Sequence, residues 1–153
     1  MTIYFNYCCY NSRYTLTKEF CERYPNVILI EIAYENRPFL FKNSFKYREP
    51  KFYGWATNVY INKFVKEHSD IESLTFIDSN LILEDMFFSD IEFCMDMNQD
   101  RPLYIQPYSV VDEKLGIMYD YKVNGSYGGH SGLCYSYNKK IIQGLQTADR
   151  RMY

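Results

Sequence analysis

Three polar clusters in the sequence contain residue types that can bind a charged ligand. They lie at residues 6–13, 34–37 and 78–80, and each directly follows an apolar segment rich in β-branched and aromatic residues. In an open α/β sheet, ligands bind beyond the carboxyl ends of the strands, where loops lead into helices. We therefore expect the three clusters to converge on one sheet edge, although each cluster alone is also typical of an ordinary solvated loop.

Asp78 has the clearest chemical potential. It follows the apolar run LTFI, which would hold its carboxylate at the end of a buried strand. Two carboxylates one residue apart would bind a hard cation such as Mg²⁺ or Mn²⁺, and the cation would bridge the phosphates of a nucleotide. Here the second position is Asn80, whose amide oxygen can bind a cation but adds no charge. The alternative is that Asp78 caps the following turn.

His130 lies in a segment of small residues, after Gly128-Gly129 and before Ser131-Gly132. Glycine on both sides lets the backbone approach a ligand closely, and a histidine there could contact a phosphate, a sugar hydroxyl or a metal. The alternative is a hydrogen-bonded loop residue. The chain has no phosphate-binding loop of the GxxxxGK type, no GxGxxG dinucleotide fingerprint and no GxSxG nucleophile motif.

Composition restricts the classes of partner. The 153 residues suffice for one domain with a hydrophobic core. Lys and Arg total 17 and Asp and Glu total 19, a formal net charge of −2, so no basic excess exists to bind a nucleic acid. No apolar run reaches the roughly 18 residues that a membrane helix needs. The five cysteines lack metal-ligand spacing, so we expect reduced thiols and a cytoplasmic protein.

The elements that must position these residues alternate between strand and helix patterns. Strands are predicted at residues 2–7, 27–33, 73–77, 103–111, 117–123 and 131–137. Helices are predicted from Asn11 or Ser12 to Arg23, and over residues 52–68, 83–97 and 139–145. Residues 34–51 are expected to be an irregular excursion. This order predicts a single α/β domain over residues 1–153, with an open, mostly parallel sheet flanked by helices.

Five segments of the chain carry a resemblance to a known family. They are FNYCCYNSR (5–13), VILIEIAYENRPF (27–39), WATNVYIN (55–62), FIDSNLIL (76–83) and GGHSGLCYSYNKKII (128–142). In this order they resemble the GT-A glycosyltransferases, in particular small relatives found in phages and large viruses. The resemblance implies a GT-A-like sheet whose nucleotide-binding half is Rossmann-like.

The resemblance also implies roles for individual residues. The nucleotide would be held by Tyr10, Asn11, Arg13, Glu31, Tyr34 and Asp78. Asp78 and Asn80 match the D-x-D motif, which in this family binds the ribose, the diphosphate and Mn²⁺ or Mg²⁺. His130 would line the acceptor side, and Asp149 would be the general base of an inverting transfer.

These residues lead to two functional expectations. The first is a transferase that moves a sugar from a nucleoside diphosphate sugar, with a UDP-sugar favoured, to a hydroxyl of a glycan or protein. It would act in the cytoplasm, or in the host cytoplasm if the protein is viral. The second is a catalytically inactive GT-A-like remnant that acts as a binding or structural module. The neutral Asn80, and a C-terminus expected to be shortened relative to the family, favour the second.

Overall fold

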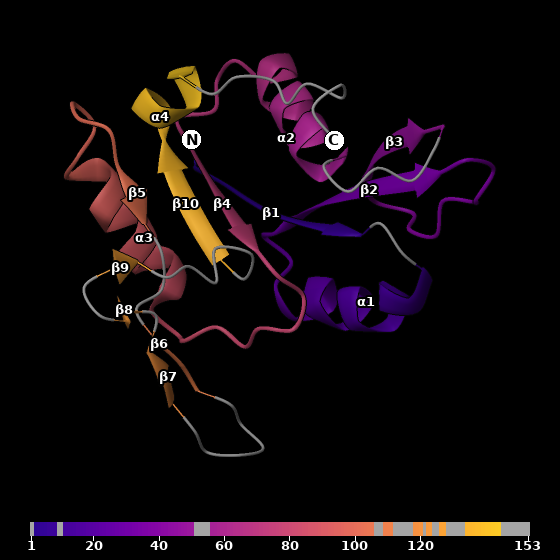
Figure 1. The fold of residues 1–153 in the computed structure, drawn as a ribbon, viewed down its shortest axis with the longest axis horizontal. Coiled ribbons are helices and arrows are strands. Elements are labelled where there is room, and N and C mark those ends of the chain that lie inside the picture. The colour runs from indigo at the N-terminus through magenta and orange to yellow at the C-terminus, as the bar shows by residue number, and fades with distance from the viewer. Residues whose placement is uncertain are drawn as a thin grey trace.

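A six-stranded sheet forms the centre of the protein in our computed structural model, which describes residues 2–8, 11–50, 56–105, 109–111, 118–120, 122–123, 126–127 and 134–144. The strand order is β3-β2-β1-β4-β10-β5 (Figure 1). The strands are β1 Thr2–Cys8, β2 Ile28–Tyr34, β3 Phe45–Glu49, β4 Ser73–Ile77, β5 Tyr104–Ile105 and β10 Cys134–Asn138. β1 to β4 run parallel, and β10 runs antiparallel to β4 and β5. The predicted open, mostly parallel α/β sheet is confirmed.

Helices cover both faces of this sheet (Figure 1). They are α1 Tyr14–Arg23, α2 Ala56–Glu67, α3 Phe87–Asp96 and α4 Lys139–Gly144. On one face, Tyr60 and Phe64 of α2 are buried against β1, β2 and β4. On the other face, Phe20 of α1 packs with Ile91 and Met95 of α3. Among the described residues, no helix is both long enough and apolar enough to cross a membrane.

Several elements differ from the sequence-based expectation. The excursion at residues 34–51 contains an edge strand, β3, whose sequence FKYRE alternates aromatic and charged residues. The strand predicted at 103–111 is two strands, β5 and β6 (Ser109–Val111), and β6 pairs with β7 (Met118–Asp120) in a separate hairpin. A second hairpin joins β8 (Lys122–Val123) to β9 (Ser126–Tyr127).

The ends of the first and last helices show how side chains set helix boundaries. A 3₁₀ turn, Asn11–Arg13, precedes α1, and the N-cap residue is Arg13, which makes no capping bond with its side chain. The predicted cap at Asn11 or Ser12 is therefore wrong. The predicted cap at Asn138 is confirmed, since its Oδ1 accepts a hydrogen bond from the Ile141 N–H at 3.4 Å.

A buried thiol and a half-buried phenol predict a loss of stability at alkaline pH. Burial raises the pKa of the Cys134 thiol from 9.0 to about 12. Burial, reinforced by Glu67, raises the pKa of the Tyr47 phenol from 10.0 to about 12. Both groups keep their protons in the folded state at pH values where the unfolded chain has lost them. The free energy of unfolding should therefore fall as pH rises from 9 to 12.

Urea unfolding at pH 8.0, 9.5 and 11 would measure this loss. In Cys134→Ala, the thiol contribution that begins near pH 9 should become smaller, because only the raised pKa of Cys21 remains, while the tyrosine contribution above pH 10 should persist. An identical pH dependence in the wild type and the variant would contradict the assignment to Cys134. The described cysteines Cys8, Cys21, Cys94 and Cys134 are all free thiols, so no disulfide among them complicates the comparison.

Candidate functional site

The chain first adds β2 and β3 on one side of β1, and then crosses to the other side of β1 to form β4. The strand order therefore reverses between β1 and β4. From β1, the chain passes through α1 on one face to β2, and from β3 it passes through α2 on the other face to β4. β1 therefore has β2 on one side and β4 on the other, with all three strands parallel. In open α/β sheets, the crevice at such a reversal, outside the carboxyl ends of the strands, is the usual place for a ligand.

Arg13 and Asp78 meet at this position. Arg13 lies in the turn after β1, and Asp78 directly follows β4. The Arg13 Nη2 donates a hydrogen bond to Asp78 Oδ1 at 2.6 Å, which joins residues 65 positions apart. Their side chains are 37% and 17% exposed, so a ligand in solvent can reach the guanidinium. The structure thus brings together one predicted residue from each of two clusters.

A buried polar network holds the turn that carries Asp78. Asn6 of β1 is 1% exposed; its Nδ2 donates to the Ile77 carbonyl at 2.5 Å and its Oδ1 accepts from the Ser79 hydroxyl at 2.9 Å. The Ser79 hydroxyl also lies 3.2 Å from that of Thr17 in α1. Ser79 is therefore directed inward, and both β1 and α1 fix the turn at the end of β4.

Glu31 serves the protein's own loop. Its carboxylate is buried and accepts hydrogen bonds from the Leu40 N–H at 2.5 Å, the Phe41 N–H at 3.3 Å and the Ser44 hydroxyl at 2.9 Å. These bonds fasten residues 40–44 to β2. Both carboxylate oxygens already accept hydrogen bonds from the protein, so we leave Glu31 out of the proposed ligand contacts.

Tyr34 likewise lies in the interior. It ends β2, is buried, and belongs to the core cluster beneath α2. The next residue, Glu35, has a φ of 53°, and the Arg48 guanidinium supports this left-handed turn by donating to the Glu35 carbonyl at 2.6 Å. Tyr34 therefore contributes to the core that supports the end of β2, and we leave its side chain out of the proposed contacts too.

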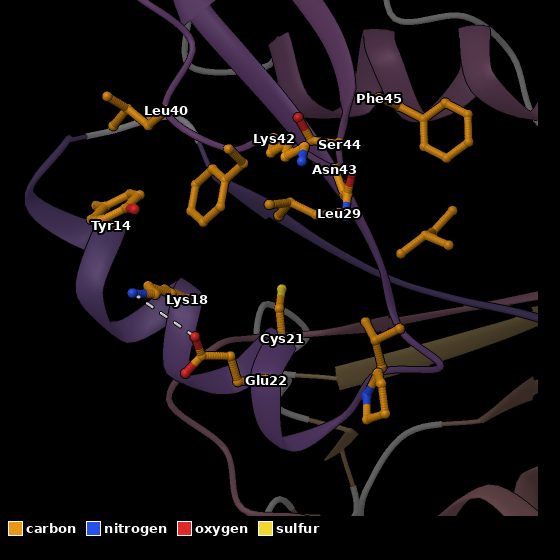
Figure 2. A pocket seen from close by; sticks show the side chains of 14 residues that line it. Tyr14, Lys18, Cys21, Glu22, Leu29, Leu40, Lys42, Asn43, Ser44 and Phe45 are labelled. Carbon is orange, nitrogen blue, oxygen red and sulfur yellow. Dashed lines mark ion pairs between the residues drawn. The ribbon is translucent and has the colours of Figure 1, made fainter.

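An open groove of about 780 Å³ lies between α1 and residues 40–45. Figure 2 shows Tyr14, Lys18 and Cys21 of α1 on one side, with Leu40, Ser44 and Phe45 across from them. The Tyr14 ring lies 5.0 Å from the ring of Phe41, and Lys18 pairs with Glu22 at 3.9 Å. None of the residues that the sequence predicted for the site lines this groove.

The groove connects to the candidate site through the chain itself, because Tyr14 directly follows Arg13. We place the chemistry at Arg13 and Asp78 and treat the groove as an adjoining surface, since its lining is mainly apolar. The sequence analysis placed Asn6 and Ser79 in the polar clusters 6–13 and 78–80 but did not predict their buried hydrogen bonds, and it missed Tyr14. The signal for a structural role of Asn6 is a polar side chain within the apolar strand TIYFNYC.

The residues around Asp78 form a poor set of donors for a divalent cation. One oxygen of the Asp78 carboxylate already accepts from a guanidinium, and that positive charge opposes a second cation at the same place. Ser79 is directed inward and Asn80 is exposed. In the part of the chain that the structure describes, no three His, Cys, Asp or Glu side chains gather to hold a metal. The metal site at Asp78 and Asn80 stays a prediction.

Other predicted site residues lie beyond the structural description. Tyr10, His130 and Asp149 fall outside the described residues, and Asn11 is described only through the backbone of its 3₁₀ turn. No protein-family model matches the chain, and no curated protein matches it in sequence.

Proposed function

We propose that this protein binds a nucleoside diphosphate sugar at the carboxyl edge of its sheet and transfers the sugar to a hydroxyl of a glycan or protein. A GT-A-like arrangement with a Rossmann-like nucleotide-binding half is part of this proposal. The observation that carries it is the meeting of Arg13 and Asp78 at the reversal of strand order. The resemblance of the segments around both residues to glycosyltransferases supports a nucleotide-sugar as the ligand, with a UDP-sugar favoured.

The surroundings of Arg13 suit a nucleotide diphosphate. A guanidinium presents a planar fork of N–H donors that matches the oxygens of a phosphate. Tyr14 and Phe41 offer aromatic surface next to it, on which a nucleobase can stack. The diphosphate would lie at Arg13 and the nucleoside along the adjoining groove.

The acceptor side of the proposal rests on the resemblance alone. It assigns His130 to the acceptor side of the cleft and Asp149 to the role of general base, which would take the proton of the acceptor hydroxyl. The proposal contains no step through Mn²⁺ or Mg²⁺, because the donors around Asp78 suit a divalent cation poorly.

Calorimetry with a panel of UDP- and GDP-sugars, each with and without Mn²⁺, tests this proposal. The wild type should bind at least one donor. Tyr14→Ala should weaken that binding by about tenfold, since stacking of a base on an aromatic ring is worth about 1–3 kcal/mol. Tyr104→Ala is the matched control: it removes an exposed tyrosine from β5, at the far edge of the sheet, and should leave binding unchanged. Failure of every donor to bind would contradict the proposal.

A second function, a binding module without catalysis, is favoured by one observation. Asp78 is already neutralised by Arg13, and its neighbour Asn80 adds no charge to attract a metal. The two functions differ in the fate of a bound donor. A transferase should release free nucleoside diphosphate when acceptor glycans or peptides are added, whereas a binding module should return the donor intact, as chromatography of the nucleotides would show.

A further inference from the structure

The Arg13–Asp78 pair places a permanent positive charge where a nucleotide diphosphate would bind. The guanidinium has five N–H donors, of which the bond to Asp78 uses one through Nη2. Resting on the proposed function, we propose that Arg13 supplies the charge that neutralises the donor's diphosphate in place of a divalent metal. Asp78 holds the guanidinium in position until the diphosphate displaces it.

A diphosphate can displace the Asp78 carboxylate from Arg13 because of its charge and its geometry. It carries more negative charge than one carboxylate and offers several oxygens to a bidentate guanidinium. Arg13 is also the N-cap residue of the ten-residue helix α1, and its side chain makes no capping bond. The positive end of the helix dipole adds to the attraction that the guanidinium exerts on an anion.

Asp78 is held in place more rigidly than Arg13. Asp78 belongs to the turn that Asn6 and Ser79 fasten to β1 and α1. Arg13 is the more exposed partner, at 37% against 17%, and its long side chain can turn toward a ligand. The geometry thus favours exchange of the guanidinium from Asp78 to the diphosphate, after which the carboxylate remains beside it and opposes the bound anion.

This arrangement reverses the effect expected of an Asp78 substitution. If Asp78 were a metal ligand, Asp78→Asn would weaken binding of a diphosphate. If Asp78 is instead the resting partner of Arg13, Asp78→Asn removes a competing and repelling charge and strengthens binding. Inorganic pyrophosphate is the suitable probe because it lacks the ribose and base, whose contacts with Asp78 would otherwise confuse the result.

The experiment measures the Kd of pyrophosphate and of UDP by calorimetry, in EDTA and in Mn²⁺. In EDTA, the wild type should bind both probes. Arg13→Ala should weaken both by at least about tenfold, Arg13→Lys should weaken them less, and Asp78→Asn should tighten pyrophosphate binding by about three- to tenfold. Arg23→Ala is the matched control, since it removes the same charge from the other end of α1. Thermal melts confirm that each variant is folded.

The possible results separate this inference from the function on which it rests. Binding that requires Mn²⁺, is lost in Asp78→Asn and persists in Arg13→Ala would overturn the role of Arg13 and leave the proposed function standing. Unchanged pyrophosphate binding in Asp78→Asn would overturn the exchange between carboxylate and diphosphate. Absence of binding to both probes under both conditions would overturn the inference and the proposed function together.

Discussion

Glu31→Ala is expected to lower the free energy of unfolding by about 3 kcal/mol, because it removes a buried carboxylate that is the acceptor for three half-buried hydrogen-bond donors. The carboxylate accepts from two backbone N–H groups, of Leu40 and Phe41, and from the Ser44 hydroxyl. A buried donor that loses its partner costs about 1–3 kcal/mol, and bonds to a charged acceptor are the stronger ones. Urea unfolding monitored by tyrosine fluorescence and circular dichroism would measure the loss.

Two further variants isolate the cause. Glu31→Gln keeps one carbonyl acceptor and should cost less than Glu31→Ala. Glu22→Ala removes an exposed carboxylate from the same groove and should change stability by less than about 0.5 kcal/mol. Hydrogen exchange should show faster exchange of the Leu40 and Phe41 amides in Glu31→Ala. Equal stability of Glu31→Ala and the wild type would contradict the conclusion that the Glu31 carboxylate holds residues 40–44 against β2.

Asn6→Ala is expected to cost about 2–3 kcal/mol and also to impair nucleotide binding. The substitution leaves the Ile77 carbonyl and the Ser79 hydroxyl without their Asn6 partner in a buried setting. It also frees the turn that holds Asp78, so the Arg13–Asp78 pair loses its fixed position. Chemical unfolding and UDP calorimetry on the same protein preparation would measure both effects.

Asn138→Ala is a demanding control for Asn6→Ala, because both residues are buried asparagines that bind backbone groups. The Asn138 Nδ2 donates to the carbonyls of Asn98 and Arg101, and its Oδ1 accepts from the Leu103 N–H. It pairs with Ser73 at the amino end of β4, away from Asp78. Asn138→Ala should therefore lose comparable stability while the folded protein keeps its affinity for UDP. Equal losses of affinity in both variants would show that reduced stability, rather than the turn at Asp78, weakens binding.

Local sequence determined most of the elements on which the site depends. The nearly continuous apolar run at 27–33 becomes β2, which is buried on both faces, and SLTFI becomes β4 with the same bounds as predicted. Such strands can be predicted from the sequence because a strand inside a parallel sheet is buried on both faces and is therefore apolar along its whole length. The place of Asp78 followed from the same pattern, since the residue after a buried strand must lie at the sheet edge.

Tertiary structure decided what the polar side chains of the candidate site do. The sequence marks Glu31 as a polar residue within an apolar strand, but only the path of residues 40–44 shows that its carboxylate accepts hydrogen bonds from the protein itself. The pairing of Arg13 with Asp78 spans 65 residues, and no local pattern encodes such a contact. β10 similarly enters the sheet between β4 and β5 against the chain order. Local propensity and periodicity act over a few residues, whereas the partner of a buried or edge polar group is chosen by the whole packed chain.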